Sequence, residues 1–365
     1  MLEHLIQTLQ QFYLTNILWG VIFFFLLYFF ILKVWSKNQN WTLKTFYYKG
    51  KQRVHEGETP RLGGLIIYLF LVIFSFFLSN LLFAKNLQIS LLCLIPMMFV
   101  TIKEDLTHNV DYKVRFLGLA LSAAALTMYA TNSLPKVDHI IVISDLFHNP
   151  IFGFAFFTLC LIALANGCNF IDGMNGLLGF YLMGALMCCM QLSFSVQDTF
   201  QAKPIVLYAL LTILFLLVNY PWGKLFLGDA GAYLMALLIG VWVIDFFGTY
   251  ESLPSWNAGL IFFYPIAEVI YSAIRKLLQN KSPFQPDREH LHLKVFDILN
   301  TAINKPRLAN NLTTVFLAIF WLAPPLILPW VYDNQPMITT ALVILSLVYI
   351  TLNRVIPPAS VYAKA

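Results

Sequence analysis

Long apolar stretches separated by short polar segments alternate along almost the whole chain. A helix needs about 20 apolar residues to cross the hydrocarbon layer of a bilayer. Segments that approach this length predict eleven membrane-spanning helices, at residues 14–34, 62–84, 87–104, 115–132, 151–170, 175–195, 204–220, 230–248, 257–278, 309–330 and 336–354. The third is short and the fifth and sixth are almost continuous, so the count has a margin of one. The pattern predicts an all-α polytopic membrane protein that forms a single domain over residues 1–365.

The composition excludes two other classes of protein. Apolar residues make up 59% of the chain and charged residues 11%, with a mean hydropathy of +0.73. Soluble domains carry about 25% charged residues, so this chain has too little polar surface for an ordinary soluble globule and too little charge for a disordered segment. The five cysteines lie in or beside apolar runs without C-x-x-C spacing, which argues against a disulfide framework or a structural zinc site.

The basic residues predict the orientation of these helices, because cytoplasmic loops carry an excess of Lys and Arg. With the N-terminus outside, 20 of the 23 Lys and Arg residues fall in inside segments, and only Lys85, Lys136 and Lys203 fall outside. We therefore expect the N-terminus outside and the C-terminus in the cytoplasm. The long outside connection at about residues 133–150 contains a β-branched run at 137–143, which predicts a short surface strand or hairpin.

Acidic, amide and imidazole side chains interrupt the apolar helix ends almost only on the predicted inner side. Four segments carry them, at residues 103–109, 166–176, 219–231 and 286–294. Carboxylates at membrane depth are costly and tend to be functional or paired. Because the four segments share one membrane face, we expect their polar side chains to lie close together.

The residue types in these segments suit a divalent cation bound to a phosphate. Asp oxygens, with water and phosphate in the remaining positions, are ligands that Mg²⁺ prefers, and Lys, Arg and His bind phosphate. Glycines beside Asp172 and Asp229 permit tight turns and close approach of the backbone to a ligand. Helices that begin just after both turns favour an anion at their N-terminal amides. The sequence predicts a magnesium–diphosphate site at the cytoplasmic membrane surface, with no nucleic acid as a partner.

Each acidic residue also has a simpler interpretation. Asp229 could cap the helix that follows it, and Asp172 could be a turn residue. Glu104 and Asp105 could form a solvated helix end. Their conjunction in four segments on one face favours a functional site over these separate explanations.

The two histidines of the last segment stand beside an acidic and basic run, Asp287-Arg288-Glu289. A single histidine in a loop is usually solvated, but two beside such a run favour a role in binding. If the segment is helical, the side chains of His290 and His292 point about 200° apart.

At five places the chain resembles the polyprenyl-phosphate N-acetylhexosamine-1-phosphate transferases of glycosyltransferase family 4. In chain order these are residues 59–64 (TPRLGG), 104–105 (ED, in the place of an Asp-Asp motif), 169–177 (NFIDGMNGL), 226–231 (FLGDAG) and 286–292 (PDREHLH). Each motif alone is weak. Five in the family's order, at equivalent helix ends within about residues 49–294, are specific.

The resemblance implies an integral enzyme of the bacterial inner membrane, with ten or eleven helices around a cytoplasmic cleft, commonly as a homodimer. It implies transfer of a HexNAc 1-phosphate from a UDP-N-acetylhexosamine to undecaprenyl phosphate, with release of UMP and a requirement for Mg²⁺ or Mn²⁺. The histidine motif is closer to enzymes that initiate O-antigen or common-antigen synthesis than to the peptidoglycan branch, which takes UDP-MurNAc-pentapeptide.

The resemblance also implies roles for individual side chains. The catalytic residues would be Asp105, Glu104, Asp229 and Asp172, with Asp229 and Asp105 as metal ligands, and the substrate-binding residues Asn169, Asn175, Arg288, His290, His292, Lys113 and Arg61. We expect a Mg²⁺ ion on Asp229 to bridge the phosphates of the UDP-sugar, and Asp105 to orient the lipid phosphate or accept its proton. Because that phosphate is already largely ionised near neutral pH, we favour its direct attack on the β-phosphorus over a covalent aspartyl intermediate.

Three positions depart from the family's pattern. Glu104 replaces the first Asp of the pair, Asn175 replaces an Asp, and Leu293 stands where some members have a further His. They leave the metal geometry and the sugar open, and they keep a non-catalytic scaffold and a UDP-MurNAc-pentapeptide transferase as alternatives. A transporter of lipid-linked or nucleotide sugars would carry its polar groups near the bilayer midplane, so their grouping at one face favours the enzyme.

Overall fold

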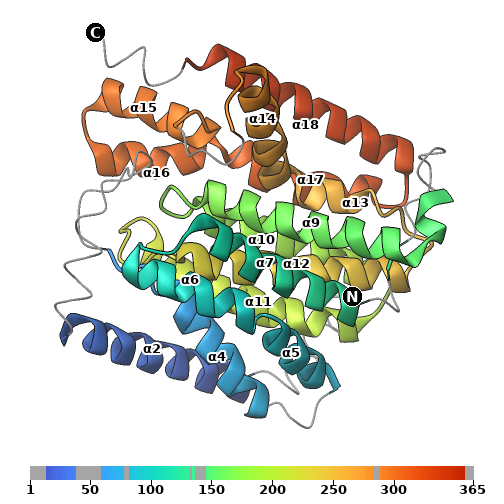
Figure 1. The fold of residues 1–365 in the computed structure, drawn as a ribbon, viewed down its shortest axis with the longest axis horizontal. Coiled ribbons are helices and arrows are strands. Elements are labelled where there is room, and N and C mark those ends of the chain that lie inside the picture. The colour runs from blue at the N-terminus through green and yellow to red at the C-terminus, as the bar shows by residue number, and fades with distance from the viewer. Residues whose placement is uncertain are drawn as a thin grey trace.

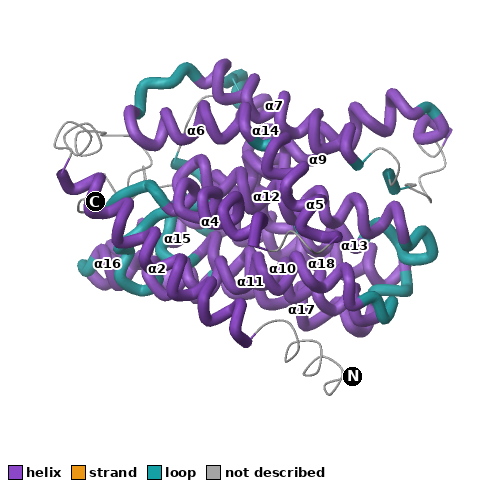
Figure 2. Tube along the Cα trace, turned by 90° about the horizontal axis from the view of Figure 1, so that it is seen from below, coloured by secondary structure: helices purple, strands orange, loops and turns teal. Residues whose placement is uncertain are grey.

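The computed structural model describes residues 14–37, 59–77, 82–130, 134–135, 145–282 and 288–357, and helices dominate this part of the chain (Figures 1 and 2). In order they are α2 (Leu14–Lys37), α4 (Gly63–Phe77), α5 (Leu82–Cys93), α6 (Ile95–Thr107), α7 (Tyr112–Tyr129), the 3₁₀-helix η2 (Asp145–His148), α9 (Pro150–Ile171), α10 (Leu177–Ser195), α11 (Thr199–Asn219), α12 (Gly228–Thr249), α13 (Asn257–Ile261), α14 (Phe263–Leu278), α15 (Leu291–Ile303), α16 (Pro306–Phe316), α17 (Ala318–Val331) and α18 (Gln335–Val355). The strand or hairpin expected at residues 137–143 lies outside the described residues.

The described helices confirm an all-helical polytopic membrane protein. Six segments are long and apolar enough to cross a bilayer: Pro150–Ile171, Leu177–Ser195, Phe200–Asn219, Gly228–Thr249, Pro306–Val331 and Gln335–Val355. A bent pair, Ala84–Cys93 with Ile95–Thr107, raises the number to seven if it forms one span, and Trp19–Val34 and Gly63–Phe77 are shorter apolar helices. The count of eleven spans and the orientation of the chain stay predictions.

Prolines explain where the helices depart from the segments predicted from hydropathy. The segment predicted at 87–104 is broken at Leu94 and bends by 60°, because Pro96 in the first turn of α6 has no N–H and its ring crowds the preceding turn. The segment predicted at 257–278 is divided into α13 and α14 at Phe262. Pro265 cannot donate to the carbonyl of Ile261, and the hydroxyl of Tyr181 on α10 donates to it instead, at 3.1 Å.

In α17, too, a side chain donates to a carbonyl that lacks its backbone N–H partner. Pro329 has no N–H for the carbonyl of Pro325, and Nε2 of Gln191 on α10 donates to this oxygen at 2.8 Å. An unpaired carbonyl in a bilayer costs several kcal/mol, so this contact holds α10 and α17 together. Gly184 permits the approach, because a Cβ there would overlap the carbonyl oxygen of Trp321.

Helix α12 lies at the centre of the molecule and packs against α4, α6, α7, α9, α10 and α11 (Figure 1). Its sequence is apolar around the whole circumference, which is typical of a fully buried helix, and nearly all its residues are buried. Small residues allow neighbours to come close: Gly240 meets Leu161, and Gly231 meets the backbone of Gly64. The N-terminus of α12 is therefore the point at which several other segments meet.

Candidate active site at the start of helix α12

The segment before α4 pairs with the segment before α12 through backbone hydrogen bonds. The N–H groups of Gly63 and Gly64 donate to the carbonyls of Phe226 and Leu227, both at 2.9 Å, and the N–H of Phe226 donates to Pro60 at 3.0 Å. A Cβ on Gly64 would overlap the backbone of Gly231, so only glycine permits this approach. The pairing brings the first and fourth motifs of the sequence together.

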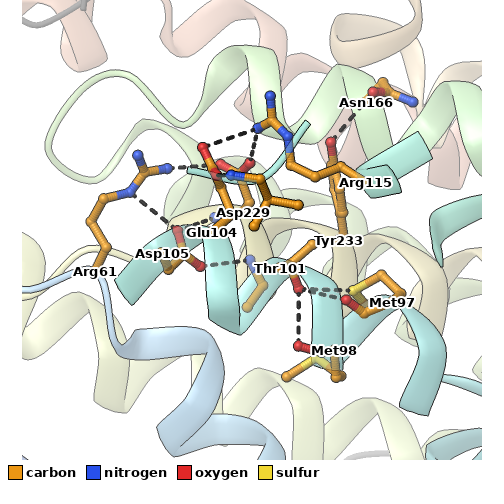
Figure 3. A network of polar contacts seen from close by, with 12 residues as sticks. Arg61, Met97, Met98, Thr101, Glu104, Asp105, Arg115, Asn166, Asp229 and Tyr233 are labelled. Atoms are coloured by element: carbon orange, nitrogen blue, oxygen red, sulfur yellow. Dashed lines mark hydrogen bonds and ion pairs between the residues drawn. The ribbon is translucent and has the colours of Figure 1, made fainter. Parts of the chain in front are cut away.

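Two arginines hold the carboxylate of Asp229 between them (Figure 3). Nη2 of Arg61 lies 2.8 Å from Oδ1, and Nη1 of Arg115 lies 2.8 Å from Oδ2. Arg61 also pairs with Asp105 through Nε, at 3.3 Å, and Arg115 lies 3.6 Å from Oε1 of Glu104. Segments before α4, at the end of α6, at the start of α7 and at the start of α12 thus supply one ionic network.

The cap of α12 comes from other helices rather than from Asp229. Both oxygens of Asp105 accept backbone hydrogen bonds, from the N–H groups of Asp229 and Ala230, each at 3.0 Å. The carboxylate of Asp172, which follows α9, lies near the N–H of Gly228. Gly228 has φ +72°, and a Cβ there would lie 2.5 Å from Oδ2 of Asp105. Asp105 therefore satisfies two of the free N–H groups of this helix end, and Asp172 lies near a third.

Glu104 and Asp105 do not form a solvated helix end, since they are 9% and 3% exposed. Oε2 of Glu104 accepts from the N–H of Val110 at 2.9 Å, while Oε1 faces Arg115. The Glu side chain thus joins the chain turn after α6 to the ionic network.

We call Arg61, Glu104, Asp105, Arg115, Asp172 and Asp229 the carboxylate–arginine cluster. Burial raises the pKa of Asp172 well above its usual value, and the nearby Asp105 and Asp229 raise it further, against the opposing effect of Arg61. His108, which follows α6, has its pKa lowered by burial and by Arg61. Burial lowers the pKa of the Arg61 guanidinium, but the surrounding carboxylates more than offset this, so the pKa is raised. Burial and crowding by other carboxylates therefore disfavour the charged form of Asp172 in the absence of a cation.

The charge and the donors of the cluster fit a divalent cation. Fully ionised, its four carboxylates would exceed the two guanidinium charges by two. Mg²⁺ commonly takes one or two protein carboxylates and completes its shell with water and phosphate. In the part of the chain that the structure describes, no group of three or more His, Cys, Asp or Glu side chains is arranged to hold a metal alone. The donors thus suit a Mg²⁺ ion that is shared with a phosphate ligand.

The histidines of the last motif lie side by side rather than on opposite faces of a helix. Helix α15 begins at Leu291, and His290 before it has extended backbone (φ −67°, ψ 144°). The two imidazoles stack with centroids 5.8 Å apart and planes 15° apart, and Phe170 packs on His290 at 4.9 Å. Nδ1 of His290 lies 3.0 Å from Oε2 of Glu268 on α14. We call Glu268, His290 and His292 the histidine cluster.

The histidine cluster contacts the loop that carries Asp172. A Cβ on Gly173 would lie 2.7 Å from Nε2 of His292, so this imidazole lies directly against the loop. Burial lowers the pKa of His292 to about 3, with Glu268 acting in the opposite direction. Arg288 turns to Asp297 on α15 at 3.0 Å, and Asp287 lies outside the described residues.

The predicted asparagines have different surroundings. The hydroxyl of Tyr233, one turn after Asp229 on α12, donates to Oδ1 of Asn166 at 3.4 Å, and Asn169 lies near the same hydroxyl. The side chain of Asn175 donates to Asn311 at 2.9 Å, and its backbone N–H donates to Asn310 at 2.7 Å. Asn169 therefore faces the start of α12, whereas Asn175 joins its loop to α16.

Lys113 and Arg115 are two residues apart, and the structure brings only the second into the cluster. The side chain of Lys113 is exposed, near the ring of Tyr112, while Arg115 reaches Asp229. The sequence hypothesis named Lys113 and missed Arg115. Residues two apart on a helix point about 200° from each other, so one of the two had to face away from α12.

Comparison with known proteins agrees with this geometry. Residues 87–247 match the family described as glycosyl transferase family 4. The chain is similar to three proteins named undecaprenyl-phosphate alpha-N-acetylglucosaminyl 1-phosphate transferase. The protein from Thermotoga maritima is 28% identical over 247 residues, which are 66% of this chain and 69% of the relative. Those from Salmonella typhimurium and Escherichia coli K12 are 28% and 24% identical over 247 residues, which in both cases are 65% of this chain and 65% of the relative.

The matched region thus spans about two thirds of the length of these relatives. Over residues 87–247 the chain matches glycosyl transferase family 4, and it is distantly related to these transferases. The resemblance predicted from the motifs is confirmed.

Proposed function

We propose that this protein transfers a HexNAc 1-phosphate from a UDP-sugar to undecaprenyl phosphate. The products are UMP and a lipid diphosphate-sugar that initiates O-antigen or a related envelope polysaccharide. The main support is the carboxylate of Asp229, held between Arg61 and Arg115 where the motif segments meet. The basic residues of the sequence favour a site on the cytoplasmic face of the bacterial inner membrane.

In this proposal Asp229 and Asp172 hold Mg²⁺, which when bound stabilises negative charge on the leaving UMP. Asp105 keeps the start of α12 in place, because both of its oxygens already accept backbone N–H groups there. The side chains of Arg61 and Arg115 are 31% and 29% exposed. Each can therefore give part of its contact with Asp229 to a phosphate oxygen.

The transfer itself needs little covalent help from the protein. An oxygen of the lipid phosphate attacks the β-phosphorus of the UDP-sugar, and the bond from that phosphorus to the oxygen bridging to UMP breaks, with its electron pair leaving on UMP. Positioning and electrostatic stabilisation supply most of the rate in phosphoryl transfer. His292 lies against the loop that carries Asp172, and His290 stacks beside it, so both imidazoles would lie next to the bound substrate. Asn169, near Tyr233 of α12, is better placed for the nucleotide or sugar than Asn175, which contacts Asn311.

The location of the polar groups supports an enzyme over a transporter. Asp105 and Arg115 lie near the ends of their helices, and Asp229 lies at the start of α12. A transporter of this size would bind its cargo near the middle of the bilayer.

UMP release by the detergent-purified protein tests the proposal, with undecaprenyl phosphate, Mg²⁺ and a panel of UDP-N-acetylhexosamines that includes UDP-MurNAc-pentapeptide. We expect release to require lipid and metal, to stop with EDTA and to resume with Mg²⁺ or Mn²⁺. The Asp229→Asn variant should lose about 10³-fold or more in turnover while its melting temperature in detergent stays close to that of the native protein. If no donor in the panel gives UMP release although the protein still binds UDP, the assignment is overturned.

A further inference from the structure

Glu268 is a buried carboxylate that the carboxylate–arginine cluster does not use. It lies on α14 and is 1% exposed, although Ile270 and Ile274 of the same helix are each 53% exposed. An acidic side chain buried on such an apolar helix is costly unless it is paired. Its contacts show which groups pair with this buried carboxylate.

Both oxygens of Glu268 contact the start of the histidine motif. Oε2 lies 3.0 Å from Nδ1 of His290, and Oε1 accepts the backbone N–H of Leu291 at 3.2 Å. The phenol groups of Tyr264 and Tyr349 are buried near this carboxylate. An ionised carboxylate can only accept hydrogen bonds, so Nδ1 of His290 must carry the hydrogen that Oε2 accepts. The imidazole is thereby fixed in one tautomer, with Nε2 as the nitrogen left for another group.

The ring of His290 also packs against two other rings. Phe170, at the end of α9, lies at 4.9 Å with its ring tilted by 44°, and the ring of His292 stacks at 5.8 Å. His292 stays neutral at ordinary pH because burial lowers its pKa to about 3, so it places no positive charge beside His290. Position, tautomer and neighbouring charge are thus all determined by buried groups.

We propose that Glu268 is a positioning residue for the transfer reaction, which accepts the Nδ1–H of His290 and so leaves Nε2 of this imidazole as an acceptor toward the substrate. The proposal rests on the function proposed above and extends it to a residue on a helix outside the five motifs. Glu268 acts through His290 and touches no substrate itself. The same carboxylate also sets where α15 begins, through the N–H of Leu291.

Glu268→Gln separates this role from simple packing, because it keeps the size of the side chain. A glutamine has one acceptor oxygen for the two donors, His290 Nδ1–H and Leu291 N–H, and it adds an NH₂ group. If the oxygen stays with Leu291, the NH₂ faces Nδ1 and favours the opposite tautomer. Glu268→Asp keeps two acceptor oxygens on a shorter arm, so it should recover part of the function.

The first measurement determines the tautomer of His290 and needs no enzymatic turnover. Nitrogen-15 spectra of histidine-labelled protein in detergent, with the His290 signals assigned from a His290→Gln sample, should show Nδ1–H in the native protein. The Glu268→Gln variant should shift to Nε2–H or to a mixture. A native spectrum with Nε2–H, or one that Glu268→Gln leaves unchanged, would overturn the proposal.

The second measurement is a double-mutant cycle on UMP release. Glu268→Gln should lower kcat by about 10–100-fold, as loss of an orienting partner typically does, with KM for the UDP-sugar little changed. In a His290→Ala background it should cause no further loss, whereas a purely structural role would lower activity in both backgrounds. Asp333→Asn, an exposed acid between α17 and α18, is the control and should match the native protein. If the native protein releases no UMP from any donor, the proposed function fails, and the nitrogen spectra still decide the Glu268–His290 contact.

Discussion

The carboxylate–arginine cluster and the histidine cluster both contain buried acids, but they differ in access to their partners. Asp229 is buried, whereas the two arginines that hold it are 31% and 29% exposed on their side chains. In the histidine cluster Glu268 and His290 are 1% and 3% exposed, so both partners are enclosed. A partly exposed guanidinium can turn to another anion at small cost, whereas an enclosed pair cannot be separated without leaving a buried charge. The carboxylate–arginine cluster can therefore exchange partners, whereas the histidine cluster fixes the imidazole of His290.

Removing an exchangeable arginine should lower turnover more than removing the carboxylate of Glu268 does. Arg115→Gln takes a donor from both Asp229 and Glu104, and we expect UMP release to fall by about 10²–10³-fold. Arg115→Lys keeps the charge without the planar fork and should fall between this variant and the native protein. Lys113→Gln, two residues away and exposed, is the matched control. An equal loss in Lys113→Gln would show that the effect follows the charge of α7 rather than the contact with Asp229.

Substitutions at two glycines distinguish an effect on stability from an effect on turnover. Gly64→Ala and Gly184→Ala each place a methyl group into a neighbouring backbone, so each should cost about 1–3 kcal/mol of stability and lower the melting temperature in detergent. Only Gly64→Ala should also lower UMP release per folded molecule, because it pushes the segment of Arg61 away from α12. The comparison fails if Gly184→Ala, on the α10–α17 contact, reduces kcat as strongly.

Mild acid should weaken the fold through the histidine cluster. The pKa of His292 is about 3 in the folded protein and about 6.5 in an unfolded chain, so between these values the unfolded chain binds a proton that the folded one does not. Stability therefore falls as pH is lowered, by about 1 kcal/mol from pH 6.5 to 5.5 for this group. Melting temperatures over this range should decline less in His292→Gln than in the native protein. Arg115→Gln should keep the native slope, and equal slopes in all three proteins would contradict the assignment.

The sequence predicted the segments of the site better than the contacts within it. Polar residues at helix ends located the regions of Asp105, Asp172 and Asp229 correctly, since hydropathy and motif spacing act locally along the chain. The cap of α12 by Asp105 was not predictable, because it joins residues 124 positions apart. The choice of Arg115 over Lys113 depends on the rotation of α7, which is set by packing such as that of Gly118 against the carbonyl of Pro96.

The helices show the same limit. Hydropathy found the apolar segments, but it could not find the break at Phe262, because hydropathy does not register the backbone N–H that Pro265 lacks. The break is tolerated since Tyr181, from a distant helix, donates to the freed carbonyl of Ile261. Glu268 is an acidic residue within the segment predicted at 257–278, and its role became apparent only from the contact with His290.

The backbone pairing of residues 60–64 with residues 226–227 has a consequence for engineering this protein. Neither segment can be exchanged alone for that of a relative, because each supplies the hydrogen-bonding edge and the glycine surface on which the other rests. A chimera that takes only one of them from a relative would pair two segments that do not fit each other, close to Asp229. The two segments form a single module split by the chain order, and a graft should move them together.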